Sequence, residues 1–175
     1  MNKWIIAVVC IVTIVLLAGC TAGAVIPLKD KTLSRAIVGE DITAGQIKEF
    51  YYTIATATCP AFYQRYYLYV DGDRYMFFHE TREGEAWPLT EEYSTRSGTV
   101  ELTRQQWEAF IAALSEGEVT ERNEDAASGG AGPSLFLYWD GDGEICQKFS
   151  FESDEKSTEF ENLCQQIVQG GPGND

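Results

Sequence analysis

Hydrophobic and polar residues alternate with a strand-like period in three stretches of the first half of the chain. Residues 50–58, 63–70 and 74–81 are rich in Tyr, Phe, Thr, Ile and Val, which suit the half-buried surface of a β-sheet. The second and third stretches flank Asp71-Gly72-Asp73. Because a short Gly-bearing turn joins antiparallel strands, these two stretches predict a β-hairpin.

A helix is predicted after residue 103, where the hydrophobic period changes. Thr103 and Gln106 supply a capping box at its start, and Gly117 is placed to end it. One face of this helix is apolar, because its large hydrophobic residues recur at helical spacing. These residues are Trp107, Phe110, Ile111 and Leu114.

The same order of elements recurs in the second half of the chain. Residues 68–73 (Leu-Tyr-Val-Asp-Gly-Asp) match residues 137–142 (Leu-Tyr-Trp-Asp-Gly-Asp), and a strand-like stretch follows at 144–151. A second helix is predicted at about residues 157–169. Its apolar stripe consists of Phe160, Leu163, Cys164 and Ile167.

These patterns predict the fold class. Each helix has one apolar face and each hairpin needs one face covered. We therefore expect an α+β fold, in which an antiparallel sheet is built from two β-hairpin-plus-helix units and both helices pack on one face. The polar residues 83–98 are expected to form a loop or a short edge strand, and the Gly-rich residues 118–133 a mobile loop.

The N-terminus predicts export. Residues 4–17 are apolar apart from one Thr and follow Lys3; the stretch has the length of a signal-peptide core and is too short to span a bilayer. The sequence Leu17-Ala18-Gly19-Cys20 at its end resembles the lipobox of bacterial lipoproteins. This resemblance covers only the first twenty residues.

The resemblance implies a lipid anchor. Leu17, Ala18 and Gly19 would be recognised by the lipoprotein signal peptidase, which cuts before Cys20, and the Cys20 thiol would carry a diacylglyceryl group. Two acyl chains anchor a protein stably, whereas one binds only marginally. The expected location is therefore the extracytoplasmic face of the cell membrane.

The lipobox divides the chain into a signal peptide (1–19), a membrane tether (20–45), a single α+β domain (46–170) and a disordered tail (171–175). Removing the first 19 of 175 residues leaves 156, enough for one domain with a core. The formal net charge is −14, and loss of Lys3 with the signal peptide makes it −15. This charge argues against nucleic acid as a partner.

Neither a cofactor nor a metal is expected. Asp140-Gly141-Asp142 resembles the start of an EF-hand loop, but Ile145 and Phe151 occupy the positions that need Gly and a bidentate Glu. His79 is the only histidine, and we interpret it as a structural residue of the sheet. No disulfide is predicted among Cys59, Cys146 and Cys164, because the last two are expected to point apart.

Tyrosines place aromatics on both faces of the first hairpin and supply the candidate ligand face. If the helices cover one face of the sheet, the other would display phenols suited to stacking on sugar rings or on a partner's surface. The alternative is that these aromatics form cross-strand pairs that stabilise the sheet, or meet the N-terminal segment. The residues are Tyr63, Tyr66, Tyr67, Tyr69 and Tyr75.

The predicted function is that of a membrane-anchored extracytoplasmic lipoprotein, a non-catalytic binding or envelope-associated module whose partner is an envelope protein or a glycan. No catalytic residue is assigned. The alternative is an envelope hydrolase that uses paired carboxylates. A concave acidic cleft would favour the hydrolase, and a flat aromatic face of the sheet would favour the binding module.

Overall fold

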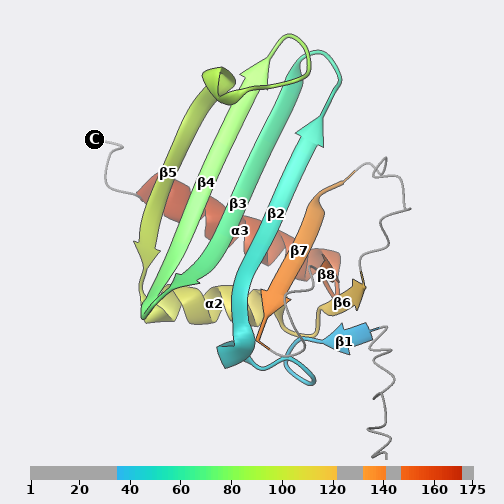
Figure 1. Ribbon diagram of the computed structural model, residues 1–175, viewed down its shortest axis with the longest axis vertical. Helices are drawn as coiled ribbons and strands as arrows, with labels where there is room; N and C mark the ends of the chain where they lie inside the picture. Colours follow the sequence, from blue (N-terminus) through green and yellow to red (C-terminus); the bar gives the residue numbers. More distant parts are fainter. Residues whose placement is uncertain (1–34, 122–131, 141–146, 171–175) are drawn as a thin grey trace, which may run out of the picture. The chain divides into compact units, whose positions relative to one another are not determined.

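The computed structural model describes residues 35–121, 132–140 and 147–170, whose eight strands form one antiparallel sheet accompanied by two α-helices (Figure 1). The order across the sheet is β1-β6-β8-β7-β2-β3-β4-β5. The predicted class, a mixed fold with an antiparallel sheet and two helices, is confirmed. The elements are β1 (Arg35–Ile37), η1 (Ala44–Gln46), β2 (Ile47–Thr56), β3 (Ala61–Asp71), β4 (Arg74–Gly84), η2 (Glu91–Tyr93), β5 (Ser94–Leu102), α2 (Arg104–Leu114), β6 (Glu118–Glu121), β7 (Ser134–Trp139), β8 (Gln147–Ser150) and α3 (Asp154–Gly170).

Strands β3 and β4 form the predicted hairpin. Asp71 pairs with Arg74 at the turn, and Gly72 has a φ of +61°, a left-handed conformation that glycine adopts without strain. The register continues without a break from this turn to the pair Ala61 and Gly84. The turn therefore fixes which residues of β3 and β4 share a face.

Helix α2 begins as its sequence predicts. Thr103 accepts a hydrogen bond from the Gln106 backbone N–H at 3.2 Å, and its own N–H donates to Gln106 Oε1 at 2.8 Å. The helix ends at Leu114, where the Gly117 N–H donates to the Leu114 carbonyl at 3.1 Å, and Gly117 also serves packing. A Cβ at Gly117 would lie 2.2 Å from the Phe149 ring, so only glycine fits there.

Both helices contact the same face of the sheet through aromatic rings. The Phe110 ring of α2 lies 5.8 Å from Phe77 of β4, and the Phe160 ring of α3 lies 5.1 Å from Phe50 of β2. Phe110 and Phe160 also meet each other edge to face at 5.5 Å. The core therefore lies between the sheet and the two helices, which cross behind the long strands in Figure 1.

The predicted tether and one predicted loop contain strands. β1 and β6 pair with each other, with Ala36 opposite Val119, and both side chains are buried. The domain boundary predicted at residue 46 is therefore too late, and residues 118–121 are not part of a loop. Each segment is too short to show a period by itself, and the two pair across more than eighty residues of sequence.

The polar region 83–98 contributes more strand than predicted. β5 extends over nine residues as an edge of the sheet. Several other predictions fall outside the described residues: the signal peptide, Cys20, the tether up to residue 34, the rest of the predicted loop from 122 to 131, and the tail. Among the described residues, no helix is long and apolar enough to span a membrane.

Candidate functional site

The sheet has one face that neither described helix covers, which we call the open face. Side chains alternate along each strand, so Tyr67 and Tyr69 of β3 point opposite to the buried Leu68. Cross-strand pairing then places Tyr51 of β2 and Phe78 of β4 beside Tyr67. The open face is defined by Tyr51, Tyr63, Arg65, Tyr67, Tyr69, Phe78, Glu80 and Arg82.

The five predicted tyrosines do not share one face. Tyr63, Tyr67 and Tyr69 lie on the open face, but Tyr66 is 5% exposed and faces the helices, where it stacks with Phe77 at 5.7 Å. Tyr75 also faces the helices. Including Tyr66 and Tyr75 in one ligand face was therefore wrong, because neighbouring residues of a strand point to opposite sides.

Tyr75 and Trp107 form a close pair on the covered face. Their rings stack at 4.7 Å with planes 11° apart. The sequence prediction also missed Tyr51, Arg65 and Phe78. Counting outward from the hairpin turn would have placed Arg65 and Phe78 on the face of Tyr67, since Tyr67 pairs with Phe78 in that register.

Three tyrosines of the open face form a continuous stack. Tyr67 stacks with Tyr51 at 4.3 Å and with Tyr69 at 4.6 Å, with planes 16° and 14° apart. The alternative interpretation, that aromatics form cross-strand pairs, thus holds for Tyr51 and Tyr67, whereas Tyr67 and Tyr69 belong to the same strand. Because another tyrosine ring stacks on each face of the Tyr67 ring, a ligand cannot stack on Tyr67. It would contact the hydroxyl-bearing edges of the stack instead.

Two phenols of this stack, those of Tyr51 and Tyr67, remain protonated at physiological pH. The Tyr51 hydroxyl donates to Glu49 Oε2 at 2.8 Å. Burial, followed by hydrogen bonds with Tyr67 and Glu49, raises the pKa of Tyr51 far above its ordinary value, and burial also raises the pKa of Tyr67. Neutral phenols can both donate and accept hydrogen bonds, so the stack presents mixed polar groups.

Two arginines flank the stack and share one carboxylate. Glu80 is 5% exposed, and its Oε1 accepts from both Nε and Nη2 of Arg82 at 2.8 Å. Arg65 Nη2 lies 3.4 Å from the other oxygen, a longer and weaker contact. Glu80 is therefore held chiefly by Arg82.

Arg65 is held mainly by an aromatic ring. Its guanidinium carbon lies 5.0 Å from the centre of the Phe78 ring, a cation–π distance. Its Nε is buried and has no hydrogen-bond partner within the described residues. Arg65 thus retains one buried donor, its Nε–H, that no described residue satisfies.

The stack, Arg65 and Phe78 line an open hollow, which we call the Arg65 hollow. Its volume is about 270 Å³, near the lower limit for small-molecule sites. Phenol hydroxyls, one aromatic face and one cation therefore converge on a space of the size of a single sugar or amino acid. The lining residues are Tyr51, Arg65, Tyr67, Tyr69 and Phe78.

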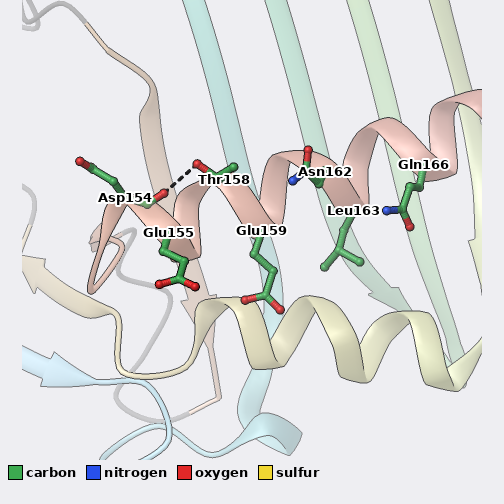
Figure 2. A pocket seen from close by; sticks show the side chains of 7 residues that line it. All are labelled: Asp154, Glu155, Thr158, Glu159, Asn162, Leu163 and Gln166. Carbon is green, nitrogen blue, oxygen red and sulfur yellow. Dashed lines mark hydrogen bonds between the residues drawn. The ribbon is translucent and has the colours of Figure 1, made fainter.

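A second hollow, the α3 hollow, runs along one helix and is acidic (Figure 2). Its volume is about 700 Å³, and Glu155 and Glu159 point from α3 toward α2. Glu159 Oε2 lies 3.2 Å from Lys156 Nζ. All lining residues come from α3: Asp154, Glu155, Thr158, Glu159, Asn162, Leu163 and Gln166.

His79 lies on the covered face. It is 8% exposed and stacks with Phe77 at 6.1 Å, and a Cβ on Gly98 would lie 3.0 Å from its Nε2. Burial, and secondarily the charge of Arg96, lower the pKa of His79. The imidazole is therefore packed on the covered face of the sheet and lines neither hollow.

The remaining candidate residues do not assemble into a site. Cys59 is exposed, Cys164 is fully buried in α3, and both are free thiols; Cys146 lies outside the described residues. Asp140 pairs with Lys48 at 2.7 Å. In the part of the chain that the structure describes, no group of three His, Cys, Asp or Glu residues could hold a metal ion.

Comparisons with protein-family models, curated proteins and solved structures found no match to this chain.

Proposed function

We propose that the protein is a lipoprotein, anchored through Cys20 to the extracytoplasmic face of the membrane, whose domain binds an envelope component without catalysis. The N-terminal sequence supports the anchor, because the apolar segment ends in the lipobox-like residues 17–20. The Arg65 hollow on the open face supports the binding role. It is the single observation that carries the proposal.

The composition of the open face favours binding. Its aromatics are only partly buried, although the sheet already has a complete core on the other side. Aromatic residues and arginine are enriched at recognition surfaces, where they bury large areas with little loss of conformational freedom. A face of this composition is costly to expose unless a ligand covers it.

We also propose that the sheet derives from two hairpin-plus-helix units. Two observations support this: the β3–β4 and β7–β8 pairs both precede a helix, and both helices contact one face. The units are unequal, because β5 lies between β4 and α2, whereas residues 151–153 between β8 and α3 contain no strand.

Site-specific photo-crosslinking in cells tests the binding role. Thr99 is exposed on β5 and pairs with Phe78, so its side chain lies on the open face beside the Arg65 hollow. A benzophenone amino acid in place of Thr99 should crosslink to an envelope component. Gln105, exposed on α2, is the matched control and should give no adduct. Equal adducts at both positions, or none at Thr99, would refute the open face as a binding surface.

The α3 hollow favours a second candidate, an envelope hydrolase. Its carboxylates would come from Asp154, Glu155 and Glu159. Glycoside hydrolysis places two carboxyl groups on opposite sides of the scissile bond, and one helix supplies only one side. We rank this candidate below the binding module. It predicts turnover of cell-wall polymers that is lost in Glu155→Gln and Glu159→Gln and retained in Tyr69→Phe.

A further inference from the structure

We infer that the Arg65 hollow binds an acidic saccharide, with Arg65 pairing to the sugar's carboxylate. This inference rests on the proposed function, since it names the class of ligand that the same open face would take. Three properties of the hollow lead to it: a cation with one unpartnered donor, a wall of phenol hydroxyls, and a volume of about 270 Å³.

The first property calls for an anion. Arg82 already neutralises Glu80 through two contacts of 2.8 Å to one carboxylate oxygen, whereas Arg65 reaches the other oxygen only at 3.4 Å. The buried Nε of Arg65 has no partner in the described ranges. A guanidinium presents its donors as a planar fork that matches a carboxylate, so this is the group it would take.

The second property calls for hydroxyls on the same ligand. Tyr67 is stacked on two sides, so a sugar ring cannot lie on its face. The Tyr51 hydroxyl already donates to Glu49, so it can only accept from a ligand, and the hydroxyl groups of a polyhydroxylated ring offer the complementary donors. The carboxylate of an apolar acid would pair with Arg65, but its carbon atoms would offer no hydrogen-bond partners to the tyrosine hydroxyls.

The third property limits the charge and size of the ligand. A volume of about 270 Å³ admits one sugar ring. The mature chain carries a formal charge of −15, which repels a densely charged polymer over about 8 Å at physiological ionic strength. The ligand is therefore a saccharide with an isolated carboxylate, and its recognition depends on short-range contacts with Arg65.

Ligand-observed NMR on the lipidated mature protein in detergent micelles tests the inference. The probes are glucuronic acid and glucose, which differ only in the carboxylate at C6, and a Glu-containing dipeptide as a non-saccharide acid. Saturation transfer is expected to glucuronic acid and neither to glucose nor to the dipeptide. Arg65→Gln should weaken glucuronic acid binding by roughly tenfold or more, the loss typical of a charge-assisted hydrogen bond.

Two matched controls separate recognition from folding. Arg74, an exposed cation at the start of β4 that pairs with Asp71, is the control for Arg65; Arg74→Gln should bind as wild type does. Tyr69→Phe removes one hydroxyl and keeps the stack, so it should weaken binding about fivefold without unfolding the sheet. Tyr63→Phe, on the same face but outside the Arg65 hollow, should have no effect.

The outcomes separate failure of this inference from failure of the proposed function. Binding of glucose equal to that of glucuronic acid, binding of the dipeptide alone, or no saccharide binding would overturn the acidic saccharide. If the Thr99 crosslink still forms, the open face remains a binding surface for another ligand. If Arg65→Gln and Tyr69→Phe both bind glucuronic acid as wild type does, the saccharide binds elsewhere and the assignment to the Arg65 hollow is wrong.

Discussion

Tyr51 and Tyr67 lie directly opposite each other on β2 and β3, with their rings stacked 4.3 Å apart on the face of the sheet that the helices leave uncovered. This pair is consistent with both interpretations of the hairpin tyrosines, as cross-strand pairs and as part of a ligand face. It stabilises the sheet as cross-strand pairs do, and it also forms one wall of the Arg65 hollow.

The first prediction concerns the stability contributed by this stack. Tyr67→Ala removes the central ring and should lower the free energy of unfolding by about 1–2 kcal/mol, since aromatic pairs add to the area they bury. The matched control is Tyr93→Ala, because Tyr93 is 44% exposed and lies outside the stack. Denaturant unfolding measures both. Equal midpoints for the two variants would mean that the stack contributes nothing.

The second prediction concerns the core. Phe160 is fully buried and meets Phe50, Tyr52 and Phe110, whereas Leu163 in the next turn of α3 is only partly buried. Phe160→Ala should therefore cost about 3–5 kcal/mol, and Leu163→Ala clearly less. Urea titrations give both values. A larger loss for Leu163→Ala would show that α3 packs with another face inward.

The third prediction concerns the anchor. Cys20→Ser removes the thiol that would receive the diacylglyceryl group, so the precursor should remain uncut by the lipoprotein signal peptidase. Metabolic labelling with an alkyne derivative of palmitate should then mark the wild type only. A variant that is still labelled and processed would exclude the lipoprotein assignment.

The fourth prediction concerns pH. Burial lowers the pKa of His79, so the folded chain keeps the imidazole neutral at a pH where the unfolded chain, with an ordinary pKa of about 6.5, has begun to bind a proton. The stability that depends on neutral His79 is therefore lost as the pH falls below about 6.5. The variant His79→Gln lacks this pH-dependent contribution to stability.

The stability difference between wild type and His79→Gln isolates the effect of the imidazole from that of the many carboxylates. Both free energies of unfolding are measured by denaturant titration from pH 8 to pH 5. The wild-type value minus the His79→Gln value should decrease as the pH falls. Arg96 remains charged throughout this range and adds to the same shift. A constant difference would contradict the burial of a neutral imidazole.

Local patterns in the sequence predicted what local interactions determine. The cap at Thr103, the apolar stripe through Phe110 and the turn at Gly72 each depend on residues within a few positions, and all three are present. The pairing of β1 with β6 depends on segments more than eighty residues apart. No local period encodes such a pair, so the start of the domain was placed too late.

The candidate site was only partly predictable for a related reason. The sequence identifies the tyrosines of the hairpin, but which of them face outward depends on which face the helices cover. The pairing of Arg65 with Glu80 follows from the register set at the turn and could have been found. The preference of Glu80 for Arg82, which leaves Arg65 Nε without a described partner, depends on side-chain distances that no sequence pattern contains.

The central claim is that an envelope component covers the open face, and hydroxyl-radical footprinting tests it most directly. Radical modification is compared between the protein in intact envelopes and the protein purified in detergent. Trp87 and Tyr93, which are 45% and 44% exposed and lie outside the open face, report general accessibility. We predict that Tyr69 and Phe78 are modified more slowly in the envelope while Trp87 and Tyr93 are not. Equal rates at Tyr69 and Phe78 in both preparations would contradict the claim.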